Sequence, residues 1–216
     1  MNKRVLVTAG PTHEKIDPVR FIGNYSSGKM GYAIAEVFAE AGASVHLVSG
    51  PVDLKTRHPG IKTIHVTSAS EMYEACRNVI VDMDIAIFSA AVADFTPLKS
   101  EVKKIKSGGV NLNMALKPTP DIALELGKEK RSNQLFIGFA LETDDELENA
   151  AHKLRKKNLD LIVLNSLKDK GAGFGGDTNK VSFISREGEV EEFDLKPKSE
   201  VARDIYVRIE KMIKDA

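Results

Sequence analysis

NYSSGKMGYAIAEVFAEAGASVHLV, residues 24–48, is the stretch that decides the fold class. Glycines stand at its start, an apolar pattern with helical spacing follows and stops at Gly42, and the β-branched run SVHLVS ends it. A turn, a helix and a strand in this order make up one unit of a parallel sheet. The stretch therefore predicts an α/β domain, and its glycines raise the question of whether the turn holds a nucleotide.

Further apolar runs rich in β-branched residues lie on both sides of this unit. Such near-continuous runs are typical of strands that are buried on both faces. Together they predict strands at residues 4–9, 44–49, 63–67, 84–90, 134–140 and 159–165. Helical patterns separate most of them, so we expect a doubly wound, mostly parallel, Rossmann-like sheet with helices on both faces.

Local signals mark the start of several helices. Ser68 with Glu71, and Thr143 with Glu146, have the spacing of a capping box. Pro120 suits the first turn of a helix, where its missing N–H is not needed.

The C-terminal part has a different pattern. Residues 180–194 alternate between apolar and polar side chains around a turn at Glu187 and Gly188, which predicts an antiparallel β-hairpin subdomain. An amphipathic helix is expected over residues 199–215. We expect all of residues 1–216 to form a single domain.

Three long stretches do not fit the alternation of strand and helix, namely residues 11–27, 95–119 and 168–180. Long loops in a compact domain are usually functional lids or disordered segments. Because residues 95–119 carry several lysines beside a glycine pair, we expect this segment to be a mobile lid that brings positive charge to phosphates.

Composition excludes several classes of function. Lys+Arg and Asp+Glu both number 31, so no field of one sign draws the whole chain to nucleic acid or to a membrane surface. No apolar run reaches the length of a membrane span. The single cysteine, Cys76, cannot form an internal disulfide and is expected to be a buried apolar residue of a cytoplasmic protein. The five histidines lack metal-ligand spacing, so we interpret none of them as a metal ligand.

The glycine turn differs from that of a dinucleotide enzyme. About sixteen residues separate the first strand from Ser26, where the turn begins, whereas a dinucleotide site needs a direct turn. Gly28 and Gly31 still allow a phosphate to approach the helix N-terminus, although tight packing of helix on strand explains these glycines equally well. A short-chain NAD(P)-dependent oxidoreductase would also need a Tyr-x-x-x-Lys pair late in the sheet, and the one such pair, Tyr25 and Lys29, precedes the first helix.

Several longer motifs occur in one order and together resemble a known family. They are TAGPT, DPVRFIGNYSSGKMG, SAAVADF, KKIKS, PDI, GFALET and RKKNLDLIVLN. In this order the chain resembles phosphopantothenoylcysteine synthetase of the bacterial, CTP-dependent type, the synthetase domain of the bifunctional coenzyme A biosynthesis protein. The resemblance runs from the first strand to about residue 165.

The resemblance implies a ligase that joins 4′-phosphopantothenate to L-cysteine through an acyl-cytidylate, with release of pyrophosphate and CMP. It implies CTP as co-substrate, Mg²⁺ as cofactor, a homodimer, and a flavin-dependent decarboxylase as a partner domain or protein. The alternatives are an NAD(P)-dependent short-chain oxidoreductase and a nucleotide-binding module without activity.

The resemblance also implies roles for particular residues. As catalytic residues it indicates Asn24 and Lys104. As substrate-binding residues it indicates Asn24, Ala90 and Ala91. As nucleotide-binding residues it indicates Gly10, Ser26, Gly28, Gly31, Asp94, Lys104, Pro120, Asp121, Ile122, Ala123, Phe139, Lys153 and Lys157.

Some positions depart from the family pattern or have a simpler explanation. The family often has His and Lys where this chain has Tyr25 and Ser107, and Asn where it has Thr119. Phe139 also fits a core aromatic residue of a buried strand. A run of lysines on a helix, such as the one that includes Lys153, is usually a solvated face.

Overall fold

The computed structural model describes residues 2–106, 112–142, 146–166 and 175–215. At its centre lies an eight-stranded sheet with the order β13-β12-β10-β9-β6-β1-β4-β5. Its strands are β1 (Arg4–Ala9), β4 (Ser44–Ser49), β5 (Ile61–His65), β6 (Ile85–Phe88), β9 (Leu135–Glu142), β10 (Leu161–Ser166), β12 (Val181–Ser185) and β13 (Val190–Glu192).

The first six of these strands are parallel, as predicted. The chain adds β4 and then β5 on one side of β1, and β6, β9 and β10 on the other. The direction of winding therefore reverses between β1 and β6, and in a doubly wound sheet such a switch point opens a crevice at the carboxyl ends of the strands. β5 begins two residues earlier than predicted, at Ile61.

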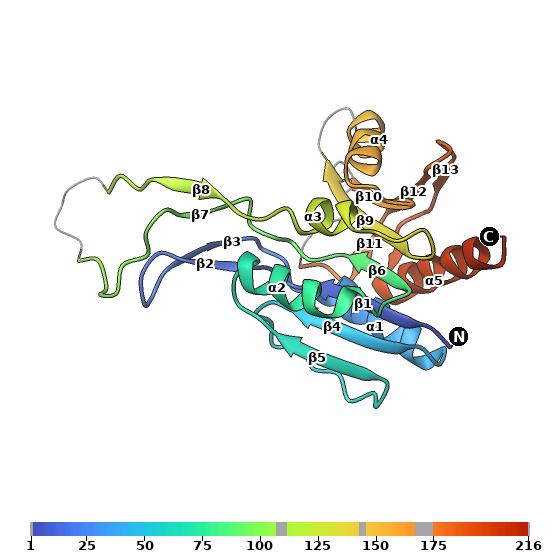
Figure 1. Cartoon of the computed structure of the whole chain (residues 1–216), viewed down its shortest axis with the longest axis horizontal. Coiled ribbons are helices and arrows are strands. Elements are labelled where there is room, and N and C mark those ends of the chain that lie inside the picture. Colours follow the sequence, from blue (N-terminus) through green and yellow to red (C-terminus); the bar gives the residue numbers. More distant parts are fainter. Residues whose placement is uncertain (1, 107–111, 143–145, 167–174, 216) are drawn as a thin grey trace.

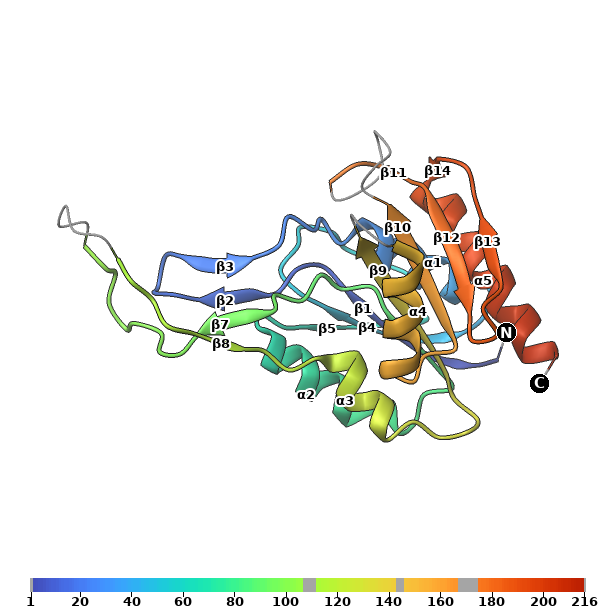
Figure 2. The same cartoon turned by 90° about the horizontal axis from the view of Figure 1, so that it is seen from above.

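The helices cover both faces of the sheet (Figure 2). They are α1 (Lys29–Glu40), α2 (Ala69–Ile80), α3 (Ile122–Lys128), α4 (Glu146–Lys156) and α5 (Lys198–Lys214). The buried side chains of α1 and α5 belong to one hydrophobic cluster, and those of α2, α3 and α4 belong to another. Side chains of β1 alternate between the two clusters, since Val5 and Val7 face α1 whereas Leu6 faces α2.

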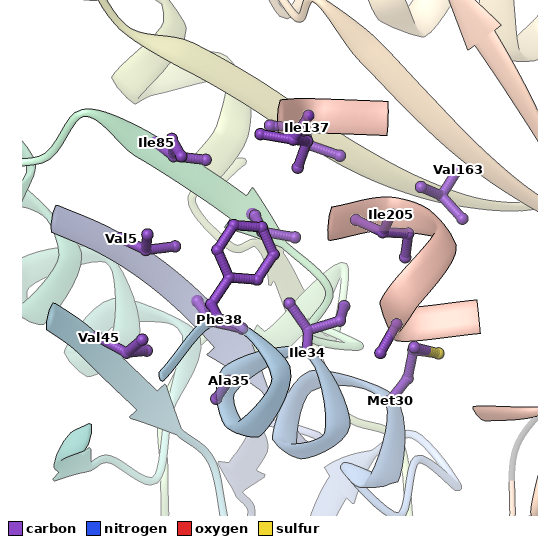
Figure 3. Close-up of a cluster of buried hydrophobic side chains, with 14 of the residues drawn as sticks. Val5, Met30, Ile34, Ala35, Phe38, Val45, Ile85, Ile137, Val163 and Ile205 are labelled. Carbon is purple, nitrogen blue, oxygen red and sulfur yellow. The ribbon is translucent and has the colours of Figure 1, made fainter. Parts of the chain in front are cut away.

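The α1 face of the core shows how the quoted stretch folds. Ile34, Ala35 and Phe38 recur at helical spacing and are fully buried. Figure 3 shows Phe38 pointing from α1 toward the sheet, next to Val5 of β1. Burying a side chain of this size contributes about 1.5–3 kcal/mol relative to leaving it exposed, so the apolar stripe of α1 is sufficient to fix the helix on the sheet.

The predicted helix starts have different outcomes. Ser68 and Glu71 form the expected capping box at α2. The expectation for Pro120 is wrong, because α3 begins at Ile122 and the side chain of Asp121 caps it by accepting a hydrogen bond from the N–H of Leu124 at 3.2 Å. Pro120 lies one residue before that cap. The predicted cap at Thr143 lies outside the described residues.

The predicted C-terminal hairpin is β12 and β13, with Gly188 in the turn at φ 88°. β12 pairs with β10 in antiparallel fashion, so the hairpin extends the central sheet. A small two-stranded sheet of β11 (Thr178–Asn179) and β14 (Lys196–Pro197) leads into α5, which packs beside α1.

A projection not foreseen in the sequence extends from the sheet (Figure 1). The stretches interpreted as loops contain paired strands: β2 (His13–Lys15) with β3 (Phe21–Gly23), and β7 (Phe95–Pro97) with β8 (Leu116–Pro118). We call residues 13–23, 95–106 and 112–118 the arm. The two chain ends lie at the opposite end of the molecule in Figure 1.

Two further expectations concern single features. Cys76 is buried in α2, as expected for an apolar residue of that helix. In the part of the chain that the structure describes, no helix is both long enough and apolar enough to span a membrane.

Candidate active site

A cavity of about 420 Å³ opens at the carboxyl ends of β1, β6, β9 and β10, where the switch point predicts a ligand. Most of the residues proposed from the sequence line it, although they come from distant parts of the chain. They are Asn24, Ser26, Gly28, Gly31, Ala90, Ala91, Asp94, Pro120, Asp121, Ile122, Ala123, Phe139, Lys153 and Lys157. The fold therefore brings together nearly all of the residues that the resemblance implies.

The glycine turn forms the part of the cavity next to α1. Gly28 has φ 76° and no side chain of its own, and it precedes α1, which has no side-chain cap. Gly31 packs so closely on β1 that an added Cβ would lie 2.5 Å from the Cβ of Ala9. The helix N-terminus thus faces the cavity as a backbone surface suited to an anion. The glycines serve both tight packing and this open surface.

Gly10 does not line the cavity itself. It has φ 76°, and its Cα would lie 3.4 Å from a Cβ added to Gly28. Because Gly10 has no side chain, the backbone of the glycine turn can pack closely on the end of β1.

Asn24 joins the loop before α1 to the segment that follows β6. Its Nδ2 donates to the carbonyl oxygens of Ala91 at 3.0 Å and Val92 at 3.1 Å. Both amide protons are therefore used, and Oδ1 remains as the group that can accept a hydrogen bond from a ligand. The small side chains of Ala90 and Ala91 leave room beside it.

The opposite part of the cavity lies between α3 and α4. Lys157 forms an ion pair with Asp121, with Nζ 2.9 Å from Oδ2 and 3.0 Å from Oδ1. Lys157 is half-buried and lines the cavity with Lys153, so these two lysines are not a merely solvated face. Phe139 is also half-buried and contacts both the core and the cavity, so both interpretations of this residue hold.

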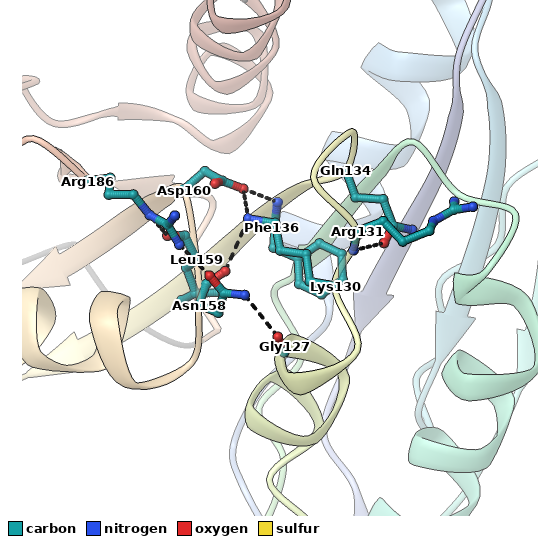
Figure 4. A network of polar contacts seen from close by, with 9 residues as sticks. All are labelled: Gly127, Lys130, Arg131, Gln134, Phe136, Asn158, Leu159, Asp160 and Arg186. Atoms are coloured by element: carbon teal, nitrogen blue, oxygen red, sulfur yellow. Dashed lines mark hydrogen bonds and ion pairs between the residues drawn. The ribbon is translucent and has the colours of Figure 1, made fainter.

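A polar network fixes the end of α4 (Figure 4). The side chain of Asn158 donates to the carbonyl of Gly127 at 3.0 Å, and Lys130 pairs with Asp160. A Cβ added to Gly127 would lie 2.2 Å from the carbonyl oxygen of Lys157. The end of α3 is therefore held against Lys157 and Asn158, which directly follow α4, and this contact sets the position of Lys157 at the cavity.

Lys104 does not line the cavity. It is exposed on the arm, one residue before Ile105. The arm holds this segment firmly, because the carboxylate of Asp17 accepts the N–H of Ile105 at 3.1 Å and the guanidinium of Arg20 donates to its carbonyl oxygen at 2.8 Å. Of the residues implied by the resemblance, Lys104 alone lies far from the others along the molecule.

Two lysines and two asparagines that sequence reasoning did not propose also line the cavity: Lys29, Asn165, Asn179 and Lys198. Lys29 stands within SSGKMG and Asn165 ends LIVLN, so their motifs offered a signal. Asn179 and Lys198 lie beyond the region of clear resemblance, and only the fold brings them to the cavity.

The carboxylates at the cavity bear on Mg²⁺ binding. Asp94 lines it, whereas the carboxylate of Asp121 is already held by Lys157 and by the N–H of Leu124. Mg²⁺ in nucleotide sites commonly takes one or two carboxylates, with phosphate oxygens and waters as its other ligands. Among the residues that the structure describes, there is no cluster of three or more His, Cys, Asp or Glu. The residues present therefore fit a metal that arrives with a nucleotide.

Comparison with known proteins identifies the family. The model of the DNA/pantothenate metabolism flavoprotein C-terminal domain matches residues 1–213. The chain belongs to this family. The chain is 47% identical over 207 residues to the coenzyme A biosynthesis bifunctional protein CoaBC of Bacillus subtilis (strain 168). That match covers 96% of this chain and 51% of the relative.

A second relative has a different name. The chain is 56% identical over 207 residues to a protein named cysteine/cysteine sulfinic acid decarboxylase, from an unknown prokaryotic organism. That match covers 96% of this chain and 58% of the relative. The chain thus spans between half and three-fifths of the length of these two relatives.

Solved structures agree with this assignment. The C-terminal domain of CoaBC superposes with a TM-score of 0.84 at 47% identity, and the match covers 100% of both chains. A Cab2 mutant in complex with phosphopantothenate-cysteine shares the fold, with a TM-score of 0.75 at 20% identity over 99% of this chain and 88% of that chain. The resemblance to phosphopantothenoylcysteine synthetase domains predicted from the motifs is confirmed, as is the α/β fold class.

Proposed function

We propose that this chain joins 4′-phosphopantothenate to L-cysteine, with CTP as the co-substrate that activates the acid. The observation that carries the proposal is the cavity at the switch point, which places the glycine turn, the Asn24–Ala91 contact and the Asp121–Lys157 pair around one space. A phosphate surface, a small acyl site and a polar nucleotide site are the parts that such a reaction requires.

The proposed reaction has two steps. The carboxylate of phosphopantothenate attacks the α-phosphorus of CTP, a P–O bond breaks, and pyrophosphate leaves. The amine of cysteine then attacks the acyl carbon of the acyl-cytidylate and loses a proton, while CMP leaves with the electrons of the C–O bond. Bound Mg²⁺ would neutralise the charge of the triphosphate.

Particular residues support each step. The backbone at Gly28 and Gly31 and the N-terminus of α1 suit the phosphates. The free Oδ1 of Asn24 suits a donor on the acyl substrate or on the attacking amine. Asp121 and Lys157 suit the polar groups of the base, with Phe139 beside them. A homodimer and a flavin-dependent decarboxylase, as a domain or as a separate protein, are part of this proposal.

Withholding cysteine tests the reaction directly. Protein, CTP, Mg²⁺ and phosphopantothenate should then accumulate pyrophosphate and an acyl-cytidylate whose mass identifies it. ATP in place of CTP measures the choice of nucleotide. Tight nucleotide binding without pyrophosphate release would instead indicate a module without activity. A nicotinamide fluorescence change would favour the oxidoreductase, for which Tyr25, 95% exposed, is poorly placed as a proton donor.

Lys104→Gln is expected to lower the rate by on the order of 10², because a positioned donor to developing negative charge is typically worth that much in catalysis. Single-turnover measurements of pyrophosphate release and of product formation would show which step the lysine assists. Lys99→Gln is a matched control, since Lys99 is another exposed lysine of the arm and its nearest charged partner is Glu101 at 4.0 Å. An unchanged rate for Lys104→Gln would remove this residue from the mechanism.

A further inference from the structure

Two lysines and an asparagine with no assigned role meet at the end of the cavity formed by α1 and α5. Lys29 is the first residue of α1 and Lys198 is the first residue of α5. Asn179 belongs to β11, next to the start of α5. All three line the cavity, so this end of it contains two cationic side chains drawn from opposite halves of the sequence.

Both ammonium groups reach one short segment. Nζ of Lys29 lies 2.6 Å from Oδ1 of Asp177 and 3.3 Å from the carbonyl oxygen of Gly175. Nζ of Lys198 donates to the carbonyl oxygen of Gly176. Since residues 175–177 are consecutive, the two positive charges lie close together beside the cavity.

The burial of Lys198 is unusual for a lysine. The residue is only 7% exposed, whereas most lysines in folded proteins are exposed. Burial lowers the pKa of Lys198, and the nearby charge of Lys29 lowers it further, whereas Asp177 opposes the change. A negative group in the cavity would favour the charged form of Lys198 further, as Asp177 does, because an opposite charge nearby stabilises an ammonium group.

Unsatisfied amide groups give an independent indication of a ligand. Asn179 is 3% exposed and Asn165 is 9% exposed, and the Oδ1 atom of each has no hydrogen-bond partner among the described residues. Buried polar atoms in native proteins nearly always have partners, so two such amide groups in the lining of one cavity indicate a ligand. An ionised phosphate accepts hydrogen bonds, so it needs the amide nitrogen rather than the oxygen. The Nδ2 of Asn179 donates to the weak acceptor Sδ of Met30 at 3.6 Å, and a half-turn of the amide exchanges its two ends and lets Nδ2 donate to a phosphate oxygen.

The two ends of the cavity carry different charged residues. Lys29 and Lys198 belong to the layer of α1 and α5, whereas Asp121 and Lys157 belong to the layer of α3 and α4 on the other face of the sheet. The exposed backbone of the glycine turn adjoins Lys29. One end of the cavity thus combines two cations with a helix N-terminus, which is the chemistry that binds phosphate groups.

We propose that Lys29 and Lys198, together with Asn179, form a subsite for the polyphosphate of the nucleotide, the part that leaves as pyrophosphate. The inference rests on the proposed function, because it deepens the nucleotide site described there. The carboxylate of Asp177 competes with the phosphates for Lys29, so binding exchanges an exposed ion pair for contacts with the ligand.

Binding of inorganic pyrophosphate, CTP and CMP to the full chain, measured by titration calorimetry, tests the subsite. Lys198→Met retains the apolar stem of the side chain and removes the charge. It should weaken pyrophosphate and CTP by about tenfold or more, the range expected for loss of a charge-assisted contact. CMP lacks the outer phosphates, so its affinity should change by no more than about twofold. Lys198→Arg should recover much of the pyrophosphate affinity.

Further variants keep the inference open to contradiction. Lys29→Met changes a more exposed side chain and should give the same selective loss, which guards against a folding defect in Lys198→Met. Lys196→Met is the matched control, because Lys196 pairs with Asp204 at 2.7 Å and does not line the cavity. Asp177→Asn should bind pyrophosphate more tightly than the unaltered chain does.

Two results would overturn the subsite. One is unchanged pyrophosphate affinity in both Lys29→Met and Lys198→Met, and the other is a loss of CMP affinity as large as the loss of pyrophosphate affinity. Failure of the proposed function looks different, since a chain that releases no pyrophosphate from CTP can still bind added pyrophosphate in a manner that depends on Lys198.

Discussion

Asp17 is a carboxylate in the arm whose side chain is fully buried. It accepts hydrogen bonds from the N–H groups of Val19 at 2.8 Å and Arg20 at 2.9 Å, and from the N–H of Ile105 across the arm at 3.1 Å. The guanidinium of Arg20 beside it holds the pKa of Asp17 well below its usual range, although burial alone would raise it. One charged residue thus connects the two halves of the arm immediately beside Lys104.

Asp17→Asn should lower the free energy of unfolding at neutral pH and should make that free energy depend less on pH in the acid range. The folded chain lowers the pKa of Asp17, so the stabilisation is complete above the ordinary aspartate pKa of about 3.9 and declines as pH falls toward the lowered value. Urea unfolding from pH 7 to pH 3 should therefore show a lower midpoint for the variant at pH 7 and a shallower decline in acid. Asp53→Asn, at an exposed position, serves as the control. Equal declines for Asp17→Asn and the unaltered chain would contradict the role of Asp17.

Cys76 is a second residue whose environment decides its chemistry. It is fully buried in α2, and burial raises the pKa of its thiol to about 12. The reactive thiolate is therefore scarce at neutral pH and shielded from reagents. We expect no reaction with a disulfide reagent such as DTNB in the native protein and one equivalent of thiol after unfolding in urea. Rapid labelling of the folded chain would contradict this environment.

At the scale of elements, the contact between α3 and the residues that follow α4 sets the nucleotide end of the cavity. Gly127 lies within α3, where alanine would normally be favoured by about 1 kcal/mol. A Cβ at this position would meet the backbone carbonyl of Lys157 at 2.2 Å, and a backbone group cannot rotate out of the way. Separation of the two helices would also disturb the ion pair between Asp121 and Lys157.

Gly127→Ala is thus expected to destabilise the chain by about 1–3 kcal/mol despite its better helix propensity, because overpacking outweighs propensity. Thermal unfolding and nucleotide affinity should both worsen. Lys128→Ala, at the next position, removes an exposed side chain paired with Glu125 and should change stability by less than about 1 kcal/mol. A Gly127→Ala chain as stable as the parent would mean that α3 and α4 can separate freely.

Elements with local signals were predictable from the sequence, and those that depend on distant pairing were not. The Ser68 capping box needs residues only three positions apart, and β1 and β4 are continuous apolar runs that any buried strand would require. β2 reads HEK and is only three residues long, so no periodicity could separate it from a loop. Its partner β3 follows a tight connection that the buried Asp17 stabilises.

The residues of the candidate site also divide into those that the sequence predicted and those that it did not. Gly28, Asn24 and Asp121 belong to motifs, and the cavity brings them together as expected. Lys198 looked like an ordinary charged residue at the start of an amphipathic helix, because its burial depends on β11 and on residues 175–177 closing over it. No pattern along the chain reveals that closure.

At the scale of the whole molecule, the arm carries apolar side chains that the rest of the chain leaves exposed. These side chains are Val19, Phe21, Phe95, Leu98, Val102, Leu112 and Leu116, each between 47% and 88% exposed. They come from both halves of the arm, and an exposed apolar patch of this kind commonly marks a contact with another protein chain. The arm also holds Lys104 away from the cavity of its own chain. A second copy of the chain, with a cavity of its own, is therefore the partner that we propose for the arm, in agreement with the proposed homodimer.

Light scattering after size-exclusion chromatography should give a mass of about twice the 23.6 kDa of one chain. A double variant, Leu98→Glu with Leu116→Glu, places charges on the arm and should shift the mass to that of a single chain, since unpaired charges are not tolerated at a buried contact. Val207→Glu is the matched control, because Val207 is 62% exposed on α5, away from the arm. The double variant should still fold, as judged by its circular dichroism, but turn over CTP slowly because Lys104 depends on the arm. A single-chain mass for the unaltered protein at micromolar concentration would contradict the dimer and would leave the apolar arm to a different partner.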